Sequence, residues 1–332
     1  MLKAEFSSYR LKFKETAITS RSQMNDKETF LISIYDDENP LVVGQGECAL
    51  FRGLSTEDNA NYEAALLKAC QNPENLPEVS SIRFGFETAI NNLNANNGAW
   101  TDNPFTRGEQ AIRINGLIWM GDKVTMLRRI KEKLALGFYC IKLKIGGINF
   151  EDELQLLKGI RREFSADDVE LRVDANGAFT PQNAMERLHR LAELNLHSIE
   201  QPIRQGQWDA MAQLCQQTPL PIALDEELIG FNSDAQKAEM LDAIKPQYII
   251  LKPSLCGGFA EADSWIKHAQ ERGIGWWATS ALESNIGLDA IAQWVSKYSP
   301  TIPQGLGTGA LYTNNFQSRL RINGEMLHYA GK

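Results

Sequence analysis

The stretch Tyr139-Cys140-Ile141-Lys142-Leu143-Lys144-Ile145-Gly146-Gly147 decides the fold prediction. Its side chains alternate with period two, so Lys142 and Lys144 share one face and the aliphatic residues share the other. This pattern is typical of a strand whose aliphatic face packs against a layer of helices. Two buried ammonium groups disfavour each other's protonation, which predicts a lysine of lowered pKa that acts as a base near neutral pH. A solvated edge strand is the alternative for this stretch taken alone.

Short apolar strands alternate with amphipathic helices from about Arg113 onward, with helices predicted, for example, over Pro181–Leu194 and Gly258–Arg272. Such alternation predicts a parallel sheet of βαβ units, and eight strands close most naturally into a barrel. An open doubly wound sheet is the runner-up, but the first strand is not followed by a phosphate-binding GxGxxG motif. The predicted strands are Arg113–Trp119, Tyr139–Ile145, Val169–Asp174, His197–Glu200, Pro221–Asp225, Gln247–Lys252, Gly275–Thr279 and Ile302–Leu306.

The first part of the chain has a different pattern, with strands followed by helices, which predicts a small α+β domain. We therefore divide the chain into an α+β lid over residues 1–112, a barrel over 113–310 and a segment over 311–332 that returns toward the lid. The expected lid strands are Ser8–Ala17, Phe30–Tyr35 and Leu41–Cys48, and the expected helices are Ser55–Gln71 and Leu76–Leu93.

Composition and charge exclude several classes of function. The chain has 332 residues, 43% of them hydrophobic and 23% charged, as in an ordinary soluble domain pair. Its net charge of −8 argues against nucleic acid as a partner. No apolar run is long enough to cross a bilayer and no signal-peptide core is present at the start, so we expect a cytoplasmic protein. The oligomeric state cannot be predicted.

Candidate catalytic residues recur at the ends of successive predicted strands. Lys144 is followed by Asp174, Glu200, Asp225 and Lys252 at intervals of 25 to 30 residues, which is one βα unit each time. In a barrel these strand ends are neighbours, so three carboxylates lie together with lysines on both sides. Oxygen ligands alone favour a hard cation, Mg²⁺ first and Mn²⁺ second. Each acid taken singly has another reading, as a cap of the following helix.

A lysine base opposite a bound cation suits one kind of reaction. A proton α to a carboxylate is too weakly acidic for a lysine to remove unless the resulting enediolate is stabilised, and a divalent cation provides that stabilisation. The predicted ligand is therefore a small-molecule carboxylate.

These residues resemble the enolase superfamily, in its muconate-lactonising-enzyme-like subgroup. The similarity covers Lys142-Leu143-Lys144, the three acids, Lys252, the lid segment Gly44–Glu47, and three further segments, Arg172–Gly177, Ala223–Glu226 and Ala278–Leu288. The resemblance implies a modified TIM barrel, (β/α)7β, with an N-terminal α+β lid domain. It also implies a magnesium-dependent lyase of menaquinone biosynthesis that dehydrates 2-succinyl-6-hydroxy-2,4-cyclohexadiene-1-carboxylate to 2-succinylbenzoate.

The resemblance implies a role for each site residue. Asp174, Glu200 and Asp225 are the expected metal ligands, and Lys144 is the expected base. Lys142 is expected to keep the pKa of its neighbour low, and Lys252 to stabilise the enediolate by its charge. Loops around Ser20-Arg21 and Phe51-Arg52-Gly53 are expected to close over the substrate. The expected substrate contacts are Arg172, Ser280, Glu283, Ser284, Gly305 and Gly307. For Arg172, an ion pair with a neighbouring carboxylate is the alternative role.

Two other functions remain open. Dipeptide epimerases and N-succinylamino acid racemases of the superfamily share the lysines and carboxylates. The epimerases typically carry Asp-x-Asp after the last strand, where this chain has Gly305-Leu306-Gly307, which argues against a cationic substrate. An inactive barrel that acts as a scaffold would have lost members of the cluster, and all are present.

Overall fold

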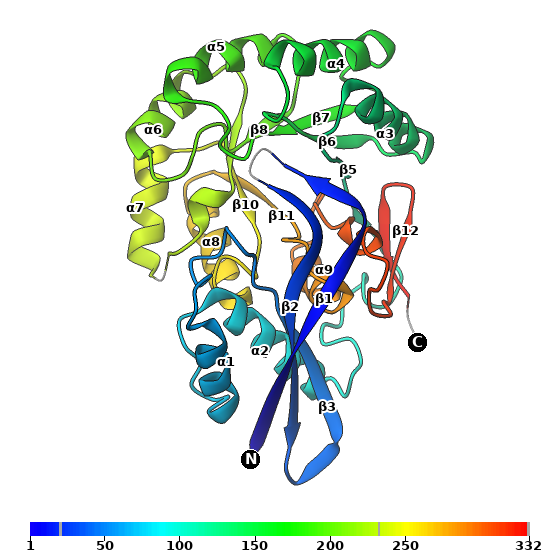
Figure 1. Cartoon of the computed structure of the whole chain (residues 1–332), viewed down its shortest axis with the longest axis vertical. Helices are drawn as coiled ribbons and strands as arrows, with labels where there is room; N and C mark the ends of the chain where they lie inside the picture. The colour runs from blue at the N-terminus through cyan, green and yellow to red at the C-terminus, as the bar shows by residue number, and fades with distance from the viewer. Residues whose placement is uncertain (20–21, 232, 331–332) are drawn as a thin grey trace.

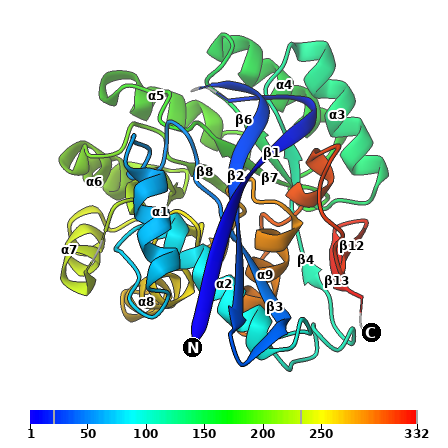
Figure 2. The ribbon, with the colours of Figure 1, turned by 60° about the horizontal axis from the view of Figure 1, so that its bottom comes forward.

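A computed structural model describes residues 1–19, 22–231 and 233–330. Its N-terminal part is an antiparallel sheet of β1 (Leu2–Ile18), β2 (Gln23–Asp36) and β3 (Asn39–Cys48), covered by α1 (Tyr62–Gln71) and α2 (Ser80–Asn94). This α+β unit lies across one end of the barrel (Figures 1 and 2). The expected strands and helices are present, but β1 begins at Leu2 instead of Ser8, α2 at Ser80 instead of Leu76, and α1 at Tyr62 instead of Ser55. Residues 55–61 form turns instead, because Ser55 accepts a hydrogen bond from Phe51 N–H and Asp58 accepts one from Gly53 N–H.

Glycines let β3 and α2 pack at backbone contact. A Cβ added at Gly46 would lie 2.0 Å from the carbonyl oxygen of Gly85, and one added at Gly85 would lie 2.4 Å from Sγ of Cys48. Backbone atoms cannot move aside as a flexible side chain can. The paired glycines therefore fix the distance between the sheet and its helix.

We expect Gly46→Ala to lower the free energy of unfolding by about 1–3 kcal/mol, the usual cost of overpacking. Gly159→Ala is the matched control, since a Cβ at this position inside α4 (Phe150–Glu163) meets nothing within 4 Å. It should raise stability by about 0.5–1 kcal/mol because alanine is the better helix former. Urea denaturation checks both variants, and equal effects of the two substitutions would contradict the packing explanation.

Seven parallel strands, β5 to β11, form one curved sheet in sequence order, with helices on its outer side (Figure 1). The aliphatic residues Ile141 and Leu143 pack outward into the main core with residues of α4, as the alternation in this strand predicted. The elements are β5 (Gly116–Ile118), α3 (Lys123–Ala135), β6 (Cys140–Lys144), α4, β7 (Glu170–Asp174), α5 (Pro181–Ala192), β8 (Ser198–Glu200), α6 (Trp208–Gln217), β9 (Ile222–Leu224), η1 (Glu226–Leu228), α7 (Asp234–Ile244), β10 (Tyr248–Leu251), α8 (Phe259–Glu271), β11 (Gly275–Ala278) and α9 (Asn285–Ser296).

The barrel closes through a segment that was predicted to be a full eighth strand over Ile302–Leu306. Only Gln304 and Gly305 form bridges there, to Ile114 on one side and to Thr279 on the other. Pro303 has no N–H to donate, which shortens the strand. The predicted first strand Arg113–Trp119 is likewise split, into β4 (Ile112–Arg113) and β5. The order of elements from β5 to Gly305 is nevertheless that of a (β/α)7β barrel.

The C-terminal residues lie against both parts of the chain. After η2 (Thr308–Leu311), Asn314 receives a hydrogen bond from Lys12 N–H of β1, at 2.8 Å. Strands β12 (Leu320–Asn323) and β13 (Met326–Tyr329) form a small sheet with β4. The division of the chain at residues 112 and 310 stays a prediction. Within the described ranges, no helix is long and apolar enough to cross a membrane.

Candidate active site

Three carboxylates meet at the carboxyl ends of neighbouring strands. Asp174 ends β7, Glu200 ends β8, and Asp225 follows β9 directly. One oxygen from each lies within 4.8 Å of the others, and all three side chains are buried. The parallel register pairs Asp174 with Glu200 and Glu200 with Ala223, so the pleat points all three to the barrel interior. The structure therefore brings together the three acids that the spacing predicted.

Each carboxylate is paired with one of the three predicted lysines. Lys142 Nζ donates to Glu200 at 2.7 Å, and Lys252 Nζ donates to Asp225 at 2.5 Å. Lys144 Nζ donates to Asp174. The amines separate the acids from the cavity, so the carboxylates lie directly behind the lysines rather than on the surface of the cavity.

Burial and neighbouring charge set the protonation of the cluster. Burial opposes ionisation of Asp174, but the ammonium groups of Lys144 and Lys142 outweigh it and hold the pKa of Asp174 well below its usual range. Glu200 behaves in the opposite way, since burial and the adjacent Asp174 carboxylate raise its pKa. Proximity of the acids thus opposes their joint ionisation, as expected for a site that binds a cation.

For Lys142, nearby acids oppose the effect that was expected between the two lysines of β6. Burial lowers the pKa of Lys142, but the carboxylates of Glu200 and Asp174 outweigh burial and raise it. Burial also opposes protonation of Lys252, while Asp225 and Glu226 raise its pKa above the usual range. The sequence argument counted the two lysines of one strand and left out the acids that contact them.

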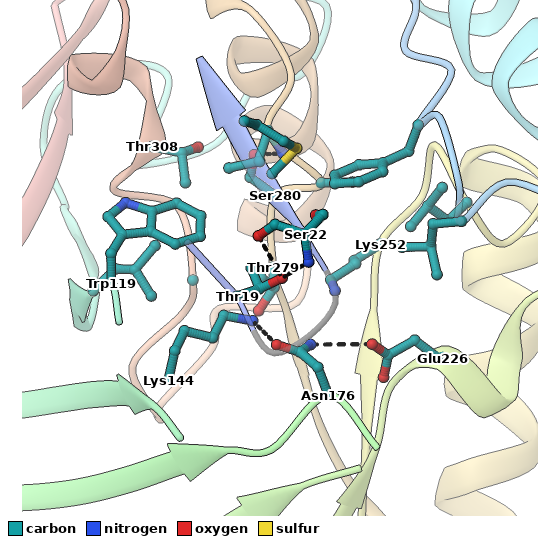
Figure 3. A pocket seen from close by; sticks show the side chains of 18 of the residues that line it. Thr19, Ser22, Trp119, Lys144, Asn176, Glu226, Lys252, Thr279, Ser280 and Thr308 are labelled. Atoms are coloured by element: carbon teal, nitrogen blue, oxygen red, sulfur yellow. Dashed lines mark hydrogen bonds between the residues drawn. The ribbon is translucent and has the colours of Figure 1, made fainter. Parts of the chain in front are cut away.

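Two amide side chains that were given no role from sequence support the cluster. Asn176 accepts a hydrogen bond from Lys144 Nζ at 3.0 Å and donates one to Glu226 at 3.0 Å, so the three residues form a chain (Figure 3). Gln201 accepts a hydrogen bond from Asp225 N–H at 3.1 Å. Asn176 lies in the segment Arg172–Gly177 that resembles the family, whereas Gln201 is marked in the sequence only by its position directly after Glu200. In the structure both residues have a positive φ.

A cavity of about 190 Å³ covers the lysine amines (Figure 3). Its floor includes Lys142, Lys144 and Lys252, and its walls include the predicted residues Ser280, Gly305 and Gly307. The predicted lid loop Phe51-Arg52-Gly53 also lines it, and Arg52 is held there by ion pairs to Glu28 and Asp58 at 2.6 and 2.8 Å. The predicted loop Ser20-Arg21 lies outside the described residues. Apolar side chains form much of the remaining wall, among them Met24, Leu54, Leu117, Trp119, Leu255 and Leu282.

Three predicted substrate contacts lie elsewhere. Arg172 is fully buried one layer below Asp174, where it donates to Glu170 at 2.7 Å and stacks on Trp277, so the alternative role, an ion pair, is the one observed. Glu283 and Ser284 lie behind the cavity wall and bind other protein groups. Alternation along a strand indicates the face of a side chain but not its depth in the barrel, which explains the misplacement of Arg172.

Polar atoms on one wall are available to a ligand. Among the described residues, Oδ1 of Asn115 and the hydroxyl groups of Thr279 and Thr308 are buried without a hydrogen-bond partner in the protein. All three residues line the cavity beside Gly305 and Gly307. Buried polar atoms normally have a partner, so this wall suits the polar end of a substrate.

The parallel barrel, its lid, and the acids and lysines at the strand ends together indicate the class of protein to which the chain belongs. The family model described as enolase C-terminal domain-like matches residues 125–329, and the chain belongs to the enolase superfamily, in its muconate-lactonising-enzyme-like subgroup.

Individual relatives within this superfamily are similar to the chain over nearly its whole length. The chain is 48% identical to the o-succinylbenzoate synthase of Desulfotalea psychrophila over 363 aligned residues, 96% of this chain and 98% of the relative. The crystal structure of MenC from the same organism matches with a TM-score of 0.83 and 44% identity, over 98% of this chain and 99% of that one. The muconate lactonizing enzyme of Pseudomonas fluorescens has the same fold, with a TM-score of 0.81 and 20% identity over 98% of this chain and 93% of that one.

Proposed function

We propose that this chain is an o-succinylbenzoate synthase, a carbon–oxygen lyase of menaquinone biosynthesis. It removes water from 2-succinyl-6-hydroxy-2,4-cyclohexadiene-1-carboxylate and releases 2-succinylbenzoate. The observation that carries this function is the 48% identity to a relative of that name across nearly the whole of both chains. The site adds the required chemistry, since the lysines line one cavity and the three carboxylates lie directly behind them.

The acid trio fits a hard divalent cation, because its donors are all carboxylate oxygens and lie close enough to share one ion. We assign Mg²⁺ to Asp174, Glu200 and Asp225, with Mn²⁺ as the alternative. When bound, the cation withdraws electron density from the substrate carboxylate and so lowers the pKa of the α-proton.

Lys144 is the residue that we assign to proton transfer. Its neutral amine takes the α-proton of the substrate, and the electron pair of the broken C–H bond forms the new ring double bond as the adjacent C–O bond breaks. The resulting ammonium returns the proton to the departing hydroxide on the same face, which gives water. Asn176 orients the amine by accepting its hydrogen bond.

The other two lysines contribute charge. Lys252 lies on the opposite side of the trio, paired with Asp225, and its raised pKa keeps it an ammonium beside the anion that develops. Lys142 contacts Glu200 and Asp174, which limits the positions these carboxylates can take. With Lys144 neutral, the Lys142 and Lys252 ammonium groups balance two of the three carboxylates. A divalent cation would then leave the site with a net positive charge, which favours an anionic substrate.

The substrate's succinyl end fits the wall formed by Asn115, Thr279 and Thr308. The hydroxyl groups there donate to carbonyl or carboxylate oxygens, and Gly305 and Gly307 leave room for them. An epimerase that binds an ammonium group would need an acid on this wall. Racemisation of an N-succinylamino acid remains the second candidate, because its substrate carries the same succinyl group and the same lysines serve it.

A paired assay tests the proposed function. Purified protein with Mg²⁺ should convert the cyclohexadiene carboxylate to 2-succinylbenzoate with a kcat/KM well above that for racemisation of an N-succinylamino acid. The opposite order of the two values would favour the racemase, and turnover of neither would contradict both assignments.

Magnesium should also stabilise the folded protein, because a ligand that binds only the native state shifts the unfolding equilibrium. At 100 times the dissociation constant the gain is about 2.7 kcal/mol, which raises the melting temperature by several degrees. Differential scanning calorimetry with and without Mg²⁺ measures the shift. An inactive barrel without a metal site should show none.

The remaining assignments are proposals that rest on the sequence. They are the cytoplasmic location, the lid and barrel boundaries at residues 112 and 310, and the lack of a nucleic-acid partner.

A further inference from the structure

A second buried charge cluster lies behind the cavity wall, where the lid meets the barrel. Its members are Lys27 on β2, Glu47 at the end of β3 and Glu283, which follows β11. Lys27 is 6% exposed and both glutamates are fully buried. Charged side chains are seldom buried to this extent unless they are paired or have a function.

Glu283 joins two turns of the active site. One carboxylate oxygen accepts a hydrogen bond from the Ser254 hydroxyl at 2.5 Å, and the other accepts one from the Ser280 hydroxyl at 2.6 Å. Ser254 lies two residues after Lys252, and Ser280 lines the cavity. A single carboxylate therefore fixes the turn that carries Lys252 relative to the opposite cavity wall.

The turn next to Glu283 has a conformation that needs such support. Leu282 lines the cavity and has a φ of 63°, in the left-handed region that a leucine rarely adopts. Its N–H donates to the Ser280 hydroxyl at 3.0 Å, and its carbonyl accepts from the Tyr312 hydroxyl at 2.7 Å. Unfavourable backbone of this kind persists where the surroundings hold it in place.

The lid holds the other end of the same turn. Glu47 accepts hydrogen bonds from the N–H and hydroxyl of Ser284, at 2.9 and 2.6 Å, and from Gly287 N–H at 3.1 Å, so it caps α9 from across the interface. A Cβ at Gly287 would lie 2.8 Å from Cβ of Glu283 and 2.9 Å from a carboxylate oxygen of Glu47. Glycine at this position leaves room for the Glu283 side-chain stem and the Glu47 carboxylate against the first turn of α9.

Lys27 supplies the positive charge in this cluster. Within the described part of the chain its Nζ is buried without a hydrogen-bond partner, and it lies 5.9 Å from the ring centre of Phe51, which lines the cavity. Burial lowers the pKa of Lys27, and the charges of Glu47 and Glu283 act against this effect. The amine therefore interacts with both acids through charge rather than through a directed hydrogen bond.

We propose that Glu283 is a positioning residue for the turns that carry Lys252 and Ser280, and that Lys27 of the lid balances its charge. The arrangement of the cavity then depends on docking of the lid. This inference rests on the proposed function, because it concerns the same site.

Charge-removing variants of similar shape test the inference. Glu283→Gln replaces one of the two acceptor oxygens with an NH2 group, which donates only, so one serine hydroxyl loses its acceptor. Lys27→Met keeps the apolar stem without the amine. Each variant should lower kcat/KM at least tenfold, since small displacements of reacting groups are costly. Displacement of the turn that carries Lys252 should lower kcat, and displacement of the wall that carries Ser280 should raise KM. Mg²⁺ affinity should stay within about twofold, because neither residue contacts the acid trio.

The double variant tests the charge balance. Removing one positive and one negative charge keeps the net charge of the cluster as in the wild type, where Glu47 is also present. Lys27→Met with Glu283→Gln should therefore be closer to the wild type than the product of the single effects. The matched control is Lys237→Met, another buried lysine, which pairs with Glu261 between α7 and α8. It should lower the melting temperature and leave kcat and KM unchanged.

Several outcomes would overturn the inference. If Glu283→Gln and Lys27→Met behave like Lys237→Met, the positioning role is wrong, and if the single effects multiply, the charge balance is wrong. If either variant does not fold, Ser254→Ala removes only one hydroxyl from Glu283 and should still lower kcat/KM.

Hydrogen exchange separates this inference from the proposed function. The amides of residues 282 and 284 should exchange faster in both charge variants and at the wild-type rate in Lys237→Met, with no substrate present. A wild-type protein without dehydratase activity would refute the proposed function, whereas unchanged exchange in the charge variants would refute the inference.

Discussion

Lys144→Ala is expected to reduce turnover by about 10⁴-fold, the upper end of the range for loss of a positioned general base. The substitution removes the amine that takes the α-proton and later returns it to hydroxide, so both bond-breaking events lose their proton partner. The three carboxylates remain, and we therefore expect the fold and Mg²⁺ affinity to be nearly intact. Steady-state kinetics and a Mg²⁺ titration on the same preparation measure these effects.

Lys144→Arg is the matched control for charge. A guanidinium keeps a positive charge beside Asp174 but does not give up its proton near neutral pH, so it cannot act as a base. It should lose as much turnover as the alanine variant. Substantial turnover in either variant would contradict the assignment of Lys144 as the base.

Asp225→Asn is expected to weaken Mg²⁺ binding by more than about 100-fold, because loss of a direct ligand should exceed the 10–100-fold cost of losing an outer-shell partner. It removes one of three anionic ligands and also leaves the Lys252 ammonium without the carboxylate that it contacts at 2.5 Å. Turnover should fall in parallel. Isothermal titration calorimetry measures the affinity, and circular dichroism checks the fold.

Glu227→Gln is the control for a nearby buried acid. Glu227 lies two residues after Asp225 but accepts hydrogen bonds from Gln201 and from Gly206 N–H, at 3.1 and 2.8 Å, outside the trio. The Mg²⁺ affinity of the Glu227→Gln variant should stay within a few-fold of the wild type. Unchanged Mg²⁺ binding in Asp225→Asn would count against the metal assignment.

The spacing of the chain predicted which acids and lysines lie together, because one βα unit separates neighbouring strand ends of a barrel. Lys144, Asp174, Glu200, Asp225 and Lys252 follow this rule, and the structure gathers their side chains beneath one cavity, with the lysines at its surface and the acids behind them. Alternation alone could not place Arg172, since it indicates the face of a strand and not the layer of the barrel. The eighth strand was predicted too long. A proline shortens a strand only where the neighbouring strand needs its N–H as a donor, and the sequence alone does not show whether Pro303 lies at such a position.

Features that depend on contacts between distant segments were not predicted. Lys142 contacts acids from two other strands, which raise its pKa, and these contacts are not visible in the local pattern. Glu283 was expected to contact substrate from the resemblance to the family, but its carboxylate accepts hydrogen bonds from Ser254 and Ser280 behind the cavity wall. Glu47 belongs to a segment that resembles the family, yet its cap on α9 is visible only once lid and barrel are placed together.

The central claim is that a cation held by Asp174, Glu200 and Asp225 acts together with the flanking amine of Lys144 on one substrate. The most direct test is to measure turnover of the cyclohexadiene substrate at varied concentrations of chelator and Mg²⁺. Purified protein should form 2-succinylbenzoate, lose this activity in excess EDTA and regain it when Mg²⁺ exceeds the chelator. Turnover that persists at full rate in EDTA, or no turnover with saturating Mg²⁺ and substrate, would contradict it.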